Sequence, residues 1–124
     1  MYETGGIMLA QLELKNDIVV INIQGRLLIE KTQEFKALCG KYFKNKKVVI
    51  NLEQVSFVGS NGVQHFLEGI EQIVNHNKHG IKVVGVKPDF KRIFDNMGLT
   101  NLHFEESNET AIAAFSKADA ILAN

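Results

Sequence analysis

The 124-residue sequence contains no tryptophan, a single proline and a single cysteine, and it has no net charge. One cysteine, Cys39, cannot form an internal disulfide or a cysteine-rich zinc site, so we expect a reducing, cytoplasmic location. Fourteen basic and fourteen acidic side chains cancel, which argues against a protein that binds nucleic acid by neutralising many phosphates. No apolar run approaches the roughly 20 residues that span a bilayer, and we expect neither membrane insertion nor an export signal.

The rest of the composition is typical of a folded domain. Hydrophobic residues make up 45% of the chain and charged residues 23%, a balance that permits a buried core. The length predicts one domain over residues 1–124, in which we expect residues 1–6 to be flexible.

Hydrophobic patterning in the first half predicts two strands, a helix and a third strand. Apolar residues tend to alternate over 7–14 and β-branched residues concentrate over 17–24, which predicts an antiparallel hairpin. Spacings of three and four predict a helix over 31–43, and the short apolar run over 47–52 predicts a buried strand. The helix residues expected on the buried face are Phe35, Leu38 and Tyr42, with Cys39 and Phe43 beside them.

The second half alternates helices with strands. The expected elements are a helix over 60–77, a strand over 81–86, a short helix from Pro88 to a stop at Gly98, a strand over 102–104, and a helix capped by Ser107 or Asn108. The first of these helices has a single apolar stripe, comprising Val63, Phe66, Leu67, Ile70, Ile73 and Val74. The residues expected to be buried on the other two are Phe90, Ile93, Phe94 and Met97, and then Ile112, Phe115, Ala118, Ile121 and Leu122.

This order of elements predicts the fold class. Strands that alternate with helices indicate an α/β fold whose central strands are parallel. We therefore predict a mixed, mostly parallel sheet of about four to five strands, extended by the N-terminal antiparallel hairpin and packed by about four helices.

No motif of a cofactor-dependent enzyme is present. The one closely spaced histidine pair, His76 and His79, lacks a third ligand, so we expect no metal site. We expect His65 to face outward and His103 to lie in the core or at its rim. The glycine-rich phosphate loop, the dinucleotide fingerprint and the strand-turn-helix serine elbow are absent, as is the acidic cluster of a receiver domain. We therefore predict no cofactor and no catalytic residue.

Small residues over Gly59–Gly62 precede the strongest helix of the sequence. Their spacing places Ser60 at the helix N-terminus, where free N–H groups and the positive end of the dipole tolerate an anion. One interpretation of Ser60 is a simple N-cap. The other is a phosphorylation site, at which about two negative charges would appear on a neutral docking surface.

The same region resembles the STAS family, the domain of bacterial anti-sigma factor antagonists. In that family an apolar strand, an acid-leucine pair and a short loop precede the pattern F-[IV]-D-S-[ST]-G-[LV], which opens a helix. Here Val48–Leu52 is followed by Val55–Val63. The similarity continues through Gly25–Leu27, Ile81–Val86 and Phe94–Leu99, so it extends over nearly the whole chain.

The resemblance implies a non-enzymatic module that docks to an anti-sigma factor acting as a serine kinase. It also implies that the kinase phosphorylates Ser60, that phosphorylation breaks the complex, and that a phosphatase restores it. We expect the docking face to combine the loop before the second helix with exposed residues of that helix. These residues are Gly59, Ser60, Asn61, Gly62, Gln64, His65, Glu68 and Glu71.

Three positions depart from the family pattern, because Leu28, Asn51 and Gly59 stand where acids are usual. Those acids border the kinase-docking face in the family. Their loss favours a changed partner, a serine that is no longer phosphorylated, or another role. Gly59 also removes like-charge repulsion beside a phosphorylated Ser60.

Two other functions stay open at this point. One is a constitutive accessory subunit of a transporter or a stress-sensing assembly, which the missing acids favour. The other is a small flavodoxin-like enzyme or ligand-binding protein that holds a phosphate or nucleotide at the Gly59–Gly62 turn.

Overall fold

The computed structural model describes residues 8–75 and 77–123, with side chains through residue 118. Its strands are β1 (Leu9–Lys15), β2 (Ile18–Arg26), β3 (Lys47–Ser56), β4 (Ile81–Val84) and β5 (Leu102–Glu105). Its helices are α1 (Ile29–Tyr42), α2 (Val63–Asn75), α3 (Pro88–Asp95) and α4 (Asn108–Ala123). The predicted order of elements is confirmed. The predictions for residues 1–6 and His76 lie outside the described residues.

The five strands form one sheet in sequence order. β1 pairs antiparallel with β2, and β2 through β5 are parallel neighbours, which confirms the predicted mixed sheet. In the two-residue turn between β1 and β2, Asn16 has a φ of 60°, a left-handed conformation that such turns require and asparagine tolerates. Next to Asn16, the Asp17 carboxylate accepts a 2.7 Å hydrogen bond from Lys47, which lowers the pKa of Asp17.

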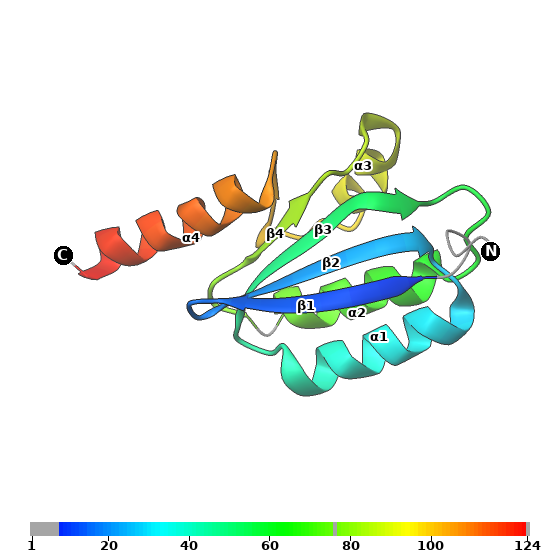
Figure 1. The fold of residues 1–124 in the computed structure, drawn as a ribbon, viewed down its shortest axis with the longest axis horizontal. Helices are drawn as coiled ribbons and strands as arrows, with labels where there is room; N and C mark the ends of the chain where they lie inside the picture. The colour runs from blue at the N-terminus through cyan, green and yellow to red at the C-terminus, as the bar shows by residue number, and fades with distance from the viewer. Residues whose placement is uncertain (1–7, 76, 124) are drawn as a thin grey trace.

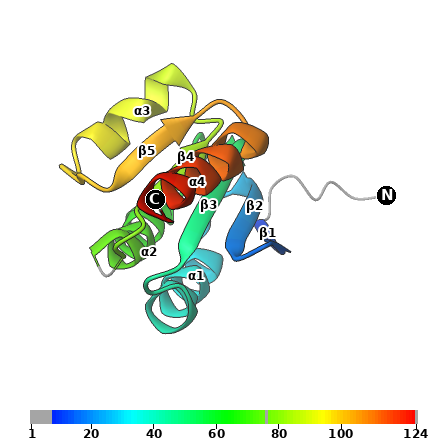
Figure 2. The same cartoon turned by 90° about the vertical axis from the view of Figure 1, so that its left-hand side faces the viewer.

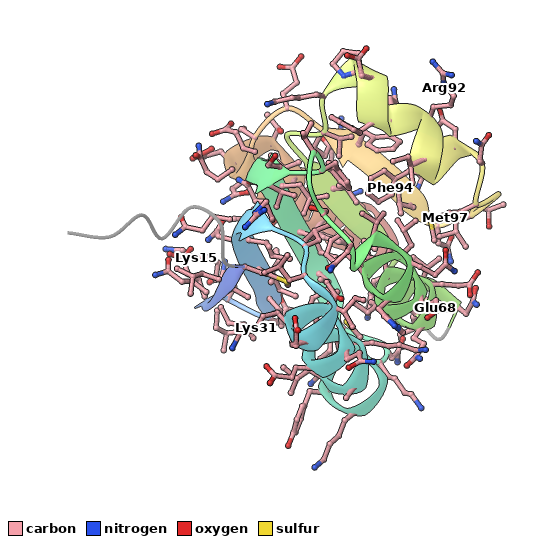
Figure 3. All side chains as sticks on the ribbon, turned by 90° about the vertical axis from the view of Figure 1, so that its right-hand side faces the viewer. Lys15, Lys31, Glu68, Arg92, Phe94 and Met97 are labelled. Carbon is pink, nitrogen blue, oxygen red and sulfur yellow. The ribbon has the colours of Figure 1, made fainter. Side chains whose placement is uncertain are left out.

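Helices cover the two faces of the sheet unequally. Figure 1 shows α1 and α2 side by side on one face, with α4 on the other. Figure 2 shows β1 at one edge of the sheet and β5, with α3 beside it, at the opposite edge. The larger core cluster includes Phe35, Phe66 and Phe94, one from each of α1, α2 and α3. In Figure 3, Phe94 points from α3 toward the sheet, whereas Arg92 points away from it.

The predicted buried face of α2 is confirmed, but that of α1 is wrong in part. Leu38 and Tyr42 are 44% and 53% exposed. The buried residues of this segment are Thr32, Phe35, Cys39 and Phe43. Thr32 can be buried because its hydroxyl donates to the Leu28 carbonyl at 2.9 Å. The buried stripe therefore passes through Thr32 instead of Leu38 and Tyr42.

The smaller core cluster packs α4 against the sheet. Ala111 and Phe115 contact β-strand residues that include Val20 and Val49, and Ser107 caps the helix by accepting the N–H of Thr110 at 3.1 Å. The predicted burial of Ala118 is wrong, since Ala118 is exposed. The described contacts with the sheet come from the first two turns of α4, and Ala118 lies beyond them. The predictions for Ile121 and Leu122 lie outside the described side chains.

Candidate functional site

The predicted site residues Gly59–Gly62 lie in the segment 57–62, which we call the β3–α2 loop. β3 continues to Ser56, where it pairs with Arg26 at the end of β2, so the loop leaves the sheet beside the β2–α1 junction. α2 begins at Val63. Ser60 therefore lies outside the helix and does not cap it, and the prediction that Ser60 starts α2 is wrong.

The Ser60 hydroxyl connects the loop to the ends of β2 and β3. Its oxygen accepts the backbone N–H of Leu27 at 2.8 Å, and its proton is donated to the carbonyl of Ser56 at 2.6 Å. Ser60 itself is half-buried, while Leu27 is fully buried. The hydroxyl thus satisfies a backbone donor that is shielded from water, an arrangement that fixes the loop conformation.

Asn61 provides a capping hydrogen bond that the N-cap residue of α1 does not make. Leu28 occupies the N-cap position of α1 and makes no side-chain cap hydrogen bond, because an aliphatic side chain has no acceptor. The Oδ1 atom of Asn61 accepts the N–H of Ile29 at 3.0 Å instead. The family acid that is absent at Leu28 would be a suitable cap, and Asn61 supplies that acceptor from a neighbouring loop.

Gly62 permits the close approach of the loop to α1. Its N–H donates to the Leu27 carbonyl at 2.7 Å. A Cβ at position 62 would collide with Oγ1 of Thr32 and would lie 2.8 Å from the carbonyl oxygen of Leu28. Only glycine fits this position without a backbone shift.

Gly59 is required for a different reason. Its φ is +76°, in the left-handed region that glycine adopts without steric cost. The Arg26 side chain packs beside it, with Cδ 3.4 Å from where a Cβ would lie. The cationic side chain of Arg26 therefore lies beside the residue that precedes Ser60.

The tip of the loop presents an apolar residue that the sequence analysis missed. Val58 is 74% exposed. Its neighbour Phe57 stacks on Phe90 of α3 with ring centroids 4.6 Å apart, which anchors the loop. The sequence signal for this exposure was the alternation of the extended segment. Val55 and Phe57 point inward, so the next residue, Val58, points outward.

Four predicted docking residues lie on α2. Gln64 and Glu71 are exposed, whereas His65 and Glu68 are half-buried. Glu68 accepts hydrogen bonds from Lys36 of α1 at 3.0 Å and from Gln64 at 3.4 Å. The bond from Lys36 is the main reason that the pKa of Glu68 is lowered.

The structure brings some of these α2 residues closer to the loop than others. Gln64 adjoins it at the start of α2, whereas Glu71 lies further along the helix. His65 was expected to face outward and is only partly exposed, and its Nδ1 lies 3.5 Å from the Glu68 carboxylate. Figure 3 labels Glu68 on α2.

Asn51, the position at which the resemblance places an acid bordering the docking face, hydrogen-bonds with α4. Its Nδ2 donates to Asn108 of α4 at 2.9 Å, and the Asn108 amide donates to Asn22 at 3.1 Å. The three asparagines connect β2 and β3 to the start of α4. The acid missing at this position therefore bears on the packing of α4.

The described part of the chain offers little else for chemistry. Within it, no group of three or more His, Cys, Asp or Glu side chains is placed to hold a metal ion. Cys39 is buried, which raises the pKa of its thiol to about 12 and leaves it unreactive. His103 is exposed on β5, which corrects its expected place in or at the rim of the core. Over the same residues, no helix has the length and apolar character needed to cross a membrane.

Comparisons with known proteins agree with this architecture. A structure of an anti-sigma factor antagonist from Mycobacterium paratuberculosis superposes with a TM-score of 0.64 at 19% identity, over 93% of this chain and 99% of that one. The anti-sigma factor antagonist SpoIIAA in its unphosphorylated form gives 0.63 at 19% identity, over 86% and 96%. The Bacillus cell fate determinant SpoIIAA in its phosphorylated form gives 0.59 at 22% identity, over 86% and 98%.

At these identities the structural matches establish the fold alone. The sequence provides the assignment to a family, because the model of the STAS domain matches residues 10–111. That match covers most of the chain, including the β3–α2 loop and all five strands apart from the first residue of β1. The chain therefore belongs to the STAS domain family.

Proposed function

We propose that this protein is a regulatory interaction module that docks to an anti-sigma factor acting as a serine kinase, with phosphorylation of Ser60 controlling the docking. The observation that carries the proposal is the pair of hydrogen bonds made by the Ser60 hydroxyl, to Leu27 and to Ser56. One modifiable group thereby determines the conformation of the loop. In this proposal the protein acts in the cytoplasm, catalyses no reaction itself and needs no cofactor.

Phosphorylation of Ser60 would remove one of the two bonds. The kinase transfers the terminal phosphoryl group of ATP to Oγ, the hydroxyl proton passes to a base of the kinase, and ADP leaves. The resulting ester oxygen has no proton to donate to the Ser56 carbonyl. The phosphate also brings about two negative charges toward that carbonyl oxygen, so the loop is expected to move away from Ser56. Hydrolysis by a phosphatase would restore the hydroxyl and release inorganic phosphate.

The surface around Ser60 suits a partner that the charge would repel. Val58 offers an exposed apolar side chain at the loop tip, which a partner pocket can bury. Leu28 and Gly59 leave this neighbourhood without the family's acids. A phosphate in the middle of such an interface would have to be desolvated, which weakens binding. The forms of SpoIIAA among the comparison structures include both a phosphorylated and an unphosphorylated one.

Affinity capture from a lysate of the native organism tests the proposal. The baits are the wild-type protein, Ser60→Ala, Ser60→Glu and Ser116→Glu, with bound proteins identified by mass spectrometry. Ser116→Glu is the matched control, since Ser116 is exposed on α4, on the other face of the sheet. The captured partner is then purified and incubated with wild-type protein and MgATP, and the modified residue is located by tandem mass spectrometry.

We expect wild type and Ser116→Glu to capture an ATP-using serine kinase that modifies Ser60. Ser60→Ala loses both hydroxyl hydrogen bonds but adds no charge, so it should still capture the kinase, more weakly than wild type and more strongly than Ser60→Glu. Ser60→Glu should bind it at least about 100-fold more weakly. Circular dichroism confirms that each variant is folded. Equal capture of a transporter or scaffold component by wild type and Ser60→Glu would contradict the phosphorylation switch and support a constitutive subunit.

A further inference from the structure

Within residues 8–75 and 77–123, β1 forms an edge of the sheet, and its outer backbone groups face no further strand. Because the turn after β1 has two residues, Lys15 and Ile18 form a hydrogen-bonded pair, and such pairs alternate along the hairpin. Ala10, Leu12 and Leu14 consequently direct their N–H and C=O groups away from β2. Among the described residues, no strand other than β2 pairs with β1.

The open edge also carries exposed apolar side chains. Leu12 is 55% exposed and Leu14 is 71% exposed. Their partners in β2 are Ile21 and Val19, which face the core cluster beneath α1 and α2. Leu12 and Leu14 therefore lie at the rim of that cluster, beyond the cover that the helices provide.

α1 adds two further apolar side chains on the same side of the sheet. Leu38 and Tyr42 are the residues that the helical spacing predicts to be buried, yet they are 44% and 53% exposed. A groove of about 230 Å³ separates α1 from β1 and is lined by both elements, including Leu38 and Ala10. Figure 3 shows this side of the molecule near the labelled Lys15 and Lys31. We call Leu12, Leu14, Leu38 and Tyr42 the β1 edge patch.

We propose that β1 is a homodimer interface, in which β1 of a second copy pairs antiparallel with it about a two-fold axis at Leu12. Leu12 is the central residue of the strand, so this register uses its whole length. Ala10 then meets Leu14 of the second copy, and Gln11 meets Glu13. Each amide thus faces a carboxylate, and the apolar side chains meet one another.

Charge and strand length favour this register over its two neighbours of equal parity. The register centred on Glu13 would place Glu13 opposite Glu13 of the second copy, where like charges repel. The register centred on Gln11 would place Leu9 opposite Glu13 and leave Leu14 and Lys15 beyond the paired length of the strand. A shift by an odd number of residues would place backbone N–H and C=O groups that point out of one β1 strand opposite groups of the other β1 strand that already point toward its own β2. The hydrogen bonds between the two copies could then not form. The occupant that fits both the open backbone and the sequence pattern is therefore a second copy of this strand.

The proposed symmetry also accounts for α1. A two-fold axis normal to the sheet keeps both copies of α1 on the same face of a continuous ten-stranded sheet. Leu38 and Tyr42 from the two copies would then lie on either side of the new strand pair. The apolar face that α1 leaves exposed in the monomer would become partly covered in the dimer.

Sedimentation and light scattering of the full chain test the proposal. We expect a concentration-dependent dimer at about 0.1 mM, and Leu12→Lys should weaken the dimer at least about 100-fold because each interface then contains two lysines. Leu14→Lys is the second variant. Val58→Lys is the matched control, since Val58 is 74% exposed, close to the 71% of Leu14, but it lies on the β3–α2 loop, and this variant should remain dimeric. Circular dichroism reports whether each variant is folded.

Single cysteines test the register. Leu12→Cys should form an intermolecular disulfide when diamide oxidises the two thiols, since paired Cα atoms lie about 5.5 Å apart. Leu14→Cys should not, because the two copies of residue 14 are about 13 Å apart in this register. The native Cys39 is buried and gives a low background.

A wild-type protein that stays monomeric at about 0.1 mM would overturn the proposal. So would a dimer that Val58→Lys dissociates and Leu12→Lys does not. Equal cross-linking at positions 12 and 14 would reject the register centred on Leu12.

Discussion

The β3–α2 loop and the β1 edge are both exposed, but their backbone groups are satisfied in opposite ways. In the loop, Ser60 and Asn61 accept the N–H groups of Leu27 and Ile29. Along β1, the outward-facing groups of alternate residues, such as Leu12, have no strand partner within the described chain. The loop is therefore a preformed surface that a covalent change can disturb, whereas the edge is a surface that a partner strand completes.

Substitution of Gly62 should produce the largest effect. Gly62→Ala places a methyl group against Oγ1 of Thr32 and the Leu28 carbonyl, so we expect a loss of about 3 kcal/mol in the free energy of unfolding. Gly98→Ala is the control, because a Cβ there has no neighbour within 4 Å. The positive φ of this position alone should lower the free energy of unfolding, by about 1 kcal/mol. Urea denaturation compares the two. Similar losses would show that the loop is not closely packed on α1.

Removal of the Ser60 hydroxyl should have the next largest effect. Ser60→Ala leaves the buried N–H of Leu27 without its acceptor, and we expect a loss of about 2 kcal/mol. Ser56→Ala is the matched control, since the Ser56 hydroxyl donates to Val58 at 3.3 Å on an exposed surface and its loss should cost less than about 0.5 kcal/mol. Amide hydrogen exchange at Leu27 should accelerate in Ser60→Ala alone. Unchanged exchange would contradict the assigned role of the hydroxyl.

The cap supplied by Asn61 should be worth less. Asn61→Ala removes the acceptor of the Ile29 N–H, and we expect a loss of about 1 kcal/mol. Asn61→Asp retains an acceptor at the start of α1 and should recover most of that loss. If thermal unfolding shows alanine and aspartate to be equivalent, Asn61 does not cap α1.

The β1 edge should tolerate change that the loop does not. Leu14→Thr alters a side chain that is 71% exposed, so we expect a change within about 0.5 kcal/mol in monomer stability. The measurement is made by denaturation at a concentration where the chain is monomeric. A loss comparable to that of Gly62→Ala would mean that the edge is already covered within one chain, and the contrast between the two regions would fail.

The smallest expected effect concerns pH. The pKa of Glu68 is lowered, chiefly by the hydrogen bond from Lys36, so its stabilising contribution is present above the unfolded-state pKa of about 4.3 and is lost as pH falls through the lower folded-state pKa. The melting temperature of Glu68→Gln should therefore decline less than that of wild type below about pH 4.5. In a Lys36→Met background the substitution should have a smaller effect, because only the contacts of Glu68 with Gln64 and His65 then remain. A full additional effect would show that the pair is not coupled.

The sequence predicts those parts of the molecule that depend on local pattern. The alternation and apolar runs gave the sheet, and the spacing from Phe66 to Val74 gave the buried face of α2. The buried face predicted for α1 was wrong in part because Phe35 belongs to two helical stripes. One stripe continues through Leu38 and Tyr42, and the other passes through Thr32. Helical spacing favours the more hydrophobic stripe, while the hydrogen bond that allows Thr32 to be buried depends on folded geometry.

The functional region shows the same limit. The sequence identified the β3–α2 loop, but it placed Ser60 at a helix start because the small residues there suit a cap. The actual partners of Ser60 and Asn61 are Leu27 and Ile29, more than thirty residues away in the sequence. Likewise, the contact between Asn51 and Asn108 joins residues 57 positions apart. Such contacts leave no periodic signal in a single sequence.

The central claim is that the chemical state of Ser60 controls docking. The most direct test is to prepare the full chain with phosphoserine at position 60 and measure its dissociation constant for the captured kinase beside that of the unmodified chain. We predict binding at least about 100-fold weaker for the phosphorylated protein. Equal dissociation constants would contradict the account.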